Sequence, residues 1–374
     1  MSDADLSSNL PSLIAHTQDM DQAPRYPLAR TTNLPQAVEP SDESAMASSH
    51  HLVRPPSDGP ARISGDKSAL VPSDPLGNPA QAKPAAGKVH FFGKLLKHDC
   101  RMGFSRNLAL YGISMVAFIS LSLLFVGEIR ALATSPLIDA PAQGKVSGTF
   151  VDLVTYHFKG RVPYVPNQDI PFTLPFDWIA IQVFVALLVG YYPVRDFRGY
   201  ASQVLIRTKN KWQWWLSKSL WVMLTVICFY LLAFLIALTV SLASGWGIPV
   251  ESAAIGGFAA GVSLAGLPPE QVVLLFLVPV LLSIALSLVQ MVLSFAIGPL
   301  WAFMGLMAYN GVSAYADTNL LIGDLSMVLR NPLVGGSGLS SELSLVLSAG
   351  VSVAAIVFGA VLFKYQDVSI RKQE

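Results

Sequence analysis

Five long stretches of this chain contain no aspartate, glutamate, lysine or arginine, and this feature restricts the fold more than any other. A helix rises about 1.5 Å per residue, so crossing a hydrocarbon core of about 30 Å takes about 20 apolar residues. Composition agrees, because 13% of the residues are charged, against about 25% in ordinary soluble domains. The chain is therefore expected to be an all-α polytopic membrane protein. The uncharged stretches are residues 107–127, 178–194, 219–250, 271–316 and 343–363.

The fourth stretch is long enough for two spans. It holds 46 residues, and Gly298 and Pro299 near its middle can end one helix and turn the chain. The sequence therefore predicts about six transmembrane helices in a membrane domain of residues 107–364. Their expected limits are about 107–127, 176–194, 219–243, 272–297, 300–316 and 343–363.

Lysine and arginine are distributed unevenly between the two sets of connecting segments. One set holds fourteen of them and the other holds five, and basic residues concentrate on the cytoplasmic side of a membrane. We therefore expect both termini in the cytoplasm, which requires an even number of spans, and a location in the plasma membrane. The basic-rich segments are residues 88–106, 195–218 and 364–374, and the basic-poor loops are 128–177, 251–270 and 317–342.

The regions outside the predicted spans differ in character. Residues 1–87 are rich in proline, serine and alanine without apolar periodicity, which predicts a disordered cytoplasmic tail. Residues 88–106 are amphipathic and predict an interfacial helix ahead of the first span, and residues 365–374 form a short cytoplasmic tail. Cys100 and Cys228 do not suggest a disulfide framework.

The residue patterns of most enzymes and ion-driven carriers are missing from the sequence. The uncharged stretches that define the six predicted spans contain no aspartate, glutamate, lysine, arginine or histidine, although ion-coupled carriers usually use such residues at membrane depth. No histidine follows His157 to act as a metal ligand or general base, and no phosphate-binding loop of the Gly-x-x-x-x-Gly-Lys type is present. We therefore expect no catalytic residue, no metal, no cofactor and no nucleic-acid partner.

The most informative segment is the loop between the second and third predicted spans. Apolar residues recur there at helical spacing, which predicts a helix with one apolar face that docks on a partner. Tryptophans and a lysine follow where the chain re-enters the membrane, as expected of anchors at the headgroup level. The predicted docking residues are Asp196, Phe197, Gly199, Tyr200, Val204 and Leu205, and the predicted anchors are Trp212, Trp214, Trp215 and Lys218.

At these residues the chain resembles the ABC-2 family of transporter permeases. The resemblance covers about residues 90–370, and it implies a coupling helix that inserts into a separate ATP-binding subunit and an interfacial elbow helix before the first span. It also implies pairing with a second permease unit, identical or related. The matching positions are Asp196, Gly199, residues 204–206, residues 207–211 and Lys218 in the loop, and residues 90–101 in the elbow.

The leading hypothesis is therefore the permease subunit of an ATP-driven transporter, with export favoured by the resemblance. Gln182, Gln290 and Asn310 are polar at membrane depth, where they could line a path or form interhelical hydrogen bonds. Two alternatives remain open at this stage. One is a scaffold or sensor whose loop 128–177 binds a ligand, and the other is an ion-coupled carrier that uses backbone carbonyls and hydroxyls.

Overall fold

The computed structural model describes a helical unit. The described residues are 84–134, 147–164, 172–202, 205, 211–248, 257, 259–262, 264, 266–316 and 321–365. Nearly all of the regular structure in them is helical, and the only bridge between extended residues joins Thr149 and Gly247. The predicted disordered tail lies outside the described residues up to residue 83, and helix α1 begins at Pro84.

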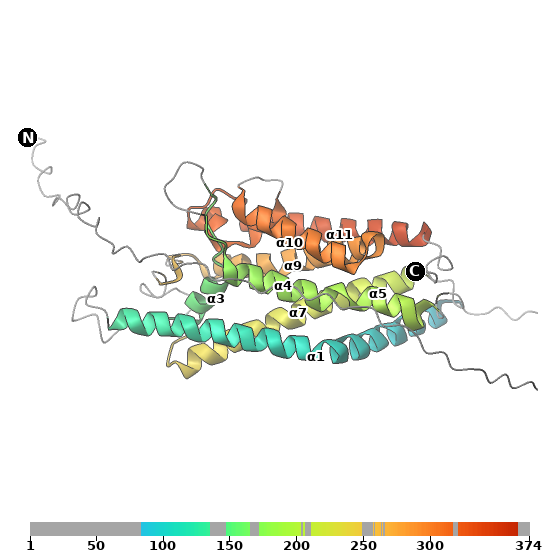
Figure 1. The fold of residues 1–374 in the computed structure, drawn as a ribbon, viewed down its shortest axis with the longest axis horizontal. Coiled ribbons are helices and arrows are strands. Elements are labelled where there is room, and N and C mark those ends of the chain that lie inside the picture. The colour runs from blue at the N-terminus through green and yellow to red at the C-terminus, as the bar shows by residue number, and fades with distance from the viewer. Residues whose placement is uncertain are drawn as a thin grey trace, which may run out of the picture. The chain divides into compact units, whose positions relative to one another are not determined.

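Five helical segments of this unit are long and apolar enough to cross a membrane. They confirm an all-helical protein whose segments could form a multi-pass bundle, and they lie side by side along one axis (Figure 1). Their bounds are Phe92–Ala133 in α1, Phe176–Gly199 in α4 (Phe176–Gly190), α5 (Tyr192–Asp196) and the turn after them, Lys211–Ala243 in α7, Pro269–Ile297 in α9 and Ser341–Tyr365 in α11.

The fifth predicted span, 300–316, corresponds to α10 (Pro299–Tyr315), which is not among these five segments. It has 17 residues, about 25 Å at the usual helical rise. Gly298 adopts φ 96°, a conformation that favours glycine, and turns the chain so that α10 runs back along α9. The carbonyl of Tyr315, the last residue of α10, accepts a hydrogen bond from the Tyr164 amide, 3.3 Å away.

α1 (Pro84–Ala133) is one uninterrupted helix of 50 residues. The predicted elbow of residues 88–106 and the predicted first span are therefore parts of the same helix. Gly103, at the expected boundary, packs against α7, because a Cβ atom there would lie 2.2 Å from Nε1 of Trp221. Its missing side chain lets the two helices approach closely.

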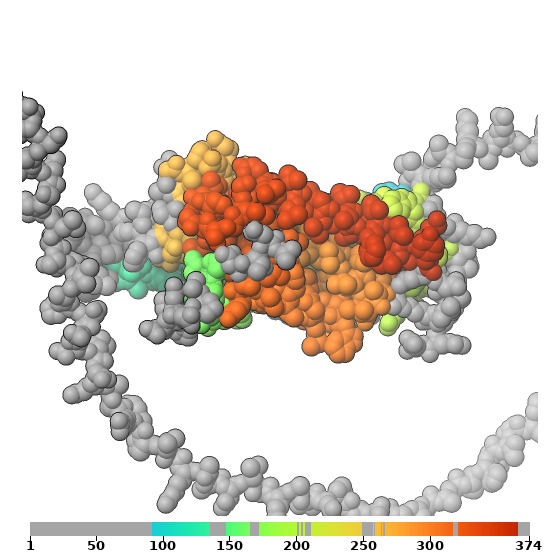
Figure 2. All heavy atoms as spheres, turned by 90° about the horizontal axis from the view of Figure 1, so that it is seen from above, coloured from blue at the N-terminus to red at the C-terminus, as the bar shows by residue number. Residues whose placement is uncertain are grey.

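α9 lies at the centre of the bundle and packs against α4, α7, α10 and α11, while α1 packs mainly against α7. Large apolar side chains remain exposed on the outer helices, where α11 and α10 cover one face (Figure 2). Such a surface suits a hydrocarbon environment. Examples are Ile113 and Val116 on α1, Trp301 and Met304 on α10, and Val353 and Phe358 on α11.

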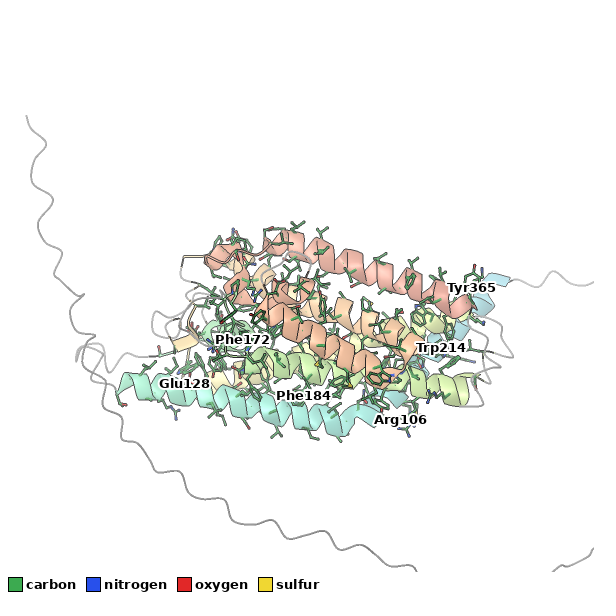
Figure 3. All side chains as sticks on the ribbon, turned by 45° about the horizontal axis from the view of Figure 1, so that its top comes forward. Arg106, Glu128, Phe172, Phe184, Trp214 and Tyr365 are labelled. Atoms are coloured by element: carbon green, nitrogen blue, oxygen red, sulfur yellow. The ribbon has the colours of Figure 1, made fainter. Side chains whose placement is uncertain are left out.

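The end of the bundle that holds Glu128 and Phe172 (Figure 3) is closed by short elements. Arg330 is buried there and donates hydrogen bonds to the carbonyls of Ala314 and Ala316, at 2.8 and 2.6 Å, and to Asp324 Oδ2 at 3.2 Å. It thus satisfies the free carbonyls at the end of α10. The elements are α3 (Phe150–Phe158), η2 (Ile322–Ser326), η3 (Val328–Arg330) and η4 (Pro332–Val334).

Candidate functional site

A buried group of charges joins three helical segments at the opposite end of the bundle. Asp99 on α1, Asp196 at the end of α5 (Tyr192–Asp196) and Lys218 on α7 are each at most 8% exposed. The Lys218 ammonium forms an ion pair with Asp99 Oδ1 and another, at 2.6 Å, with Asp196 Oδ2. We refer to these three residues as the ionic cluster.

Neighbouring hydroxyl groups complete the hydrogen bonding of Asp99. Tyr192 donates to Oδ1 at 3.1 Å and Ser217 donates to Oδ2 at 2.6 Å. The ring of Tyr192 also faces the Lys218 ammonium, with 4.6 Å between the nitrogen and the ring centroid. The Trp214 ring faces the same nitrogen, with its centroid 5.3 Å away. Buried charges are tolerated only when they are paired and hydrogen-bonded in this way.

A group of aromatic side chains packs next to the ionic cluster and includes Trp214, which is labelled in Figure 3. Phe197 lies within 5.7 Å, centroid to centroid, of Trp214, Phe295 and Phe363. Trp214 and Phe363 stack at 4.8 Å. We call Phe197, Trp214, Trp215, Phe295 and Phe363 the aromatic cluster. It connects the end of α5 to α7, α9 and α11.

These contacts correct the predicted docking face. Phe197 and Leu205 are each 4% exposed, so their side chains belong to the core of this chain and are not free to dock. Asp196 is likewise engaged by Lys218. The amphipathic pattern of the loop reflects packing on its own bundle. Tyr200 is described by its backbone alone, and Val204 lies outside the described residues.

Within residues 192–202, the described part of the loop that follows α4, the exposed residues lie at an irregular turn. The π-helical turn η1 (Phe197–Ala201) follows α5, and Gly199 leaves the helical range with φ −102° and ψ −118°. Arg195, Arg198 and Gly199 are exposed. π-Helical turns occur often at functional sites. We call residues 192–202 the corner.

The predicted membrane anchors also need correction. Trp212 is 52% exposed, as an interfacial residue should be, whereas Trp214 and Trp215 are each 1% exposed and Lys218 is fully buried. Trp215 donates its indole hydrogen to the Ile356 carbonyl at 3.0 Å. Three of the four residues therefore hold helices together inside the protein. They are positioned by α7, which begins at Lys211, earlier than the predicted span.

Charged residues lie in the same helices as the predicted spans, beyond the limits expected for those spans. The membrane-length segments extend beyond the uncharged stretches and contain Asp99, Asp196 and Lys218. Sequence reasoning missed Asp99 as a site residue altogether. The available signal was the helical spacing of apolar residues in the two basic segments, residues 88–106 and 195–218. This spacing would have placed the charges of these segments in helices of the bundle.

The three predicted pathway residues are all buried. Gln290 donates to the Ala186 carbonyl at 3.0 Å, and Gln182 accepts a hydrogen bond from Ser283 at 3.4 Å, so both join α4 to α9. The Asn310 side chain on α10 has no hydrogen-bond partner in the described part of the chain. Gln182 and Gln290 thus form the interhelical hydrogen bonds that the sequence left as an alternative to a path.

His157 is buried at the other end of the bundle. Ser122 donates its proton to the Phe118 carbonyl at 2.8 Å, so the 3.0 Å contact between Ser122 Oγ and His157 Nε2 places the hydrogen on Nε2. The His157 pKa is lowered to about 3, mainly by burial and to a smaller extent by the nearby charge of Lys159. The imidazole is therefore neutral at physiological pH.

No family model matches this chain, and no curated protein matches its sequence.

Proposed function

We propose that this chain is the permease subunit of an ATP-driven transporter, with six spans and both termini in the cytoplasm. A separate ATP-binding subunit would press on the corner, and a second permease unit would complete the pathway. The ABC-2 resemblance of residues 90–370 suggests the class, and the organisation of the corner supports it.

One observation carries the proposal: the corner is fastened to most of the bundle. The ionic cluster ties Asp196 to α1 and α7, and the aromatic cluster ties Phe197 to α7, α9 and α11. A displacement of the corner is therefore transmitted to four other helices through buried side chains. Coupling through a packed protein travels along such contiguous contacts.

Copurification from native membranes tests this proposal. The full chain extracted in mild detergent should bring down a protein that hydrolyses ATP. The Arg198→Glu variant, which changes an exposed residue of the corner, should bring down about tenfold less of it, because a reversed charge at a contact opposes binding. Arg130→Glu, exposed near the end of α1, is the matched control and should behave as the unaltered protein.

An ion-coupled carrier is the second candidate, because charges are buried within membrane-length helices. Two features favour a mechanical role for the cluster instead. Both oxygens of Asp99 already accept hydrogen bonds, and Asp196 lies next to the exposed corner. Transport by the purified chain in vesicles with an imposed proton or sodium gradient and no ATP would favour the carrier.

A further inference from the structure

A cavity of about 390 Å³ opens where α3 meets the start of α4, at the end of the bundle opposite the ionic cluster. Its volume is in the range of small-molecule sites, which are about 300–1,000 Å³. Aromatic side chains of Tyr156, Phe176 and Trp178 form part of its wall. Trp178 is held in place by the hydrogen bond that its indole donates to Ser326 Oγ at 2.8 Å.

Charges of both signs face this cavity, and Lys159 and Asp177 act on each other there without forming an ion pair. Lys159, Arg161 and Asp177 all line it, and none of the three takes part in an ion pair within the described part of the chain. The Lys159 ammonium instead lies over the Tyr156 ring, 4.2 Å from its centroid. Burial lowers the pKa of Lys159, and the charge of Asp177 opposes part of this effect.

Such an arrangement favours a ligand that carries both charges. A ligand carboxylate would supply the missing partner of Lys159 and Arg161, and a ligand ammonium would supply that of Asp177. Charge-assisted hydrogen bonds of this kind are about twice as strong as neutral ones. The aromatic wall suits an apolar group held between the two charged ends.

We propose that this cavity binds a small zwitterion with an apolar body, of the amino-acid type. The carboxylate pairs with Lys159 and Arg161, the ammonium pairs with Asp177, and the apolar body lies on Tyr156, Phe176 and Trp178. This site is independent of the transport function, since it makes no use of the corner or of an ATP-binding subunit.

Binding of three matched compounds to the purified full chain in detergent, measured by titration calorimetry, tests the proposal. L-Phenylalanine carries both charges, 3-phenylpropanoate lacks the ammonium, and 2-phenylethylamine lacks the carboxylate. L-Phenylalanine should bind about tenfold or more tightly than either analogue, because each analogue leaves one charge of the cavity unpaired. Equal binding of 3-phenylpropanoate would overturn the proposal in favour of an anion site. Absence of saturable binding of L-phenylalanine would overturn it altogether.

Two variants assign each charge of the ligand to its partner. Lys159→Gln should remove most of the advantage of L-phenylalanine over 2-phenylethylamine and leave its advantage over 3-phenylpropanoate. Asp177→Asn should have the opposite pattern. Arg130→Gln, near the same end but outside the cavity, should change neither ratio. Because each variant serves as its own reference across the three compounds, general damage to the fold cannot produce this crossed pattern. Ratios unchanged in both variants would place the binding elsewhere.

Discussion

At the scale of single residues, the buried charge of Lys218 depends on its two carboxylate partners. Its ammonium is fully buried and lies between two carboxylates, Asp99 and Asp196. Removing one partner of a buried ion pair costs about 3–5 kcal/mol, because the remaining charge is left uncompensated, whereas replacing all partners by neutral groups costs far less. The cluster therefore behaves as one unit in mutational tests.

Lys218→Met should accordingly destabilise the protein by about 3 kcal/mol or more, since two buried carboxylates are left facing each other. The triple variant Asp99→Asn, Asp196→Asn and Lys218→Met should recover a large part of this loss. Thermal unfolding in detergent, followed by tryptophan fluorescence, measures both. A triple variant less stable than Lys218→Met would contradict the assignment of these residues to one cluster.

His157 predicts how stability depends on pH. Its pKa falls from 6.5 to about 3 in the folded protein, so between those values the unfolded chain binds a proton that the folded chain does not. Stability should therefore fall as the pH is lowered through this window, by at most about 1.4 kcal/mol per pH unit. His157→Phe keeps a ring beside Phe118. In this variant the midpoint temperature of unfolding should depend less on pH between pH 6.5 and 4. An equally steep dependence in the variant would assign the effect to other groups.

At the scale of elements, the junction of α1 and α7 depends on a glycine. A Cβ atom at Gly103 would lie 2.2 Å from Trp221, whereas at Gly112, on the same helix, nothing lies within 4 Å. Gly103→Ala should lower the free energy of unfolding by about 1–3 kcal/mol through overpacking. Gly112→Ala should be neutral or stabilise the protein by up to about 1 kcal/mol through helix propensity. Equal effects of the two changes on the unfolding midpoint would contradict the close packing of α1 on α7.

Helix positions could be predicted from the sequence because long uncharged stretches report them directly, as in α9 and α11. The ends of helices could not, because α1 and α7 continue into basic flanks that look like connecting segments. The predicted docking face was wrong because the spacing of Phe197 and Leu205 predicts an apolar face but does not say which surface covers it. Here the covering surface is the chain's own α7, α9 and α11 for Phe197.

At the scale of the whole molecule, the predicted number of membrane crossings depends on α10, since five other segments are long enough to cross. The start of α7 and the end of α11 lie at the same end of the bundle, where the Lys211 ammonium donates to the Lys364 carbonyl at 3.1 Å. Trp214 and Tyr365 also share this end (Figure 3). Such a path is expected if α10 crosses back, which agrees with the distribution of basic residues.

Cysteine accessibility in intact cells tests this topology. After Cys100 and Cys228 are replaced by serine, a cysteine at Lys372 should be unreactive toward an impermeant reagent, and a cysteine at Glu342 should react. Permeabilised cells, in which both should react, provide the control. Labelling at position 372 in intact cells would show that the C-terminus is outside and that the number of spans is odd.

The central claim is that the corner receives motion from an ATP-binding subunit. Photo-cross-linking, which detects direct contact between the two proteins, tests it most directly. A photoactivatable amino acid replaces the exposed Arg198 in the full chain, and a second variant carries it at Arg130, near the opposite end of the bundle. The account predicts that irradiation of cell membranes links position 198, and not position 130, to a protein that binds ATP. Cross-linking of position 198 to lipid or to this chain alone, with no ATP-binding protein captured, would contradict it.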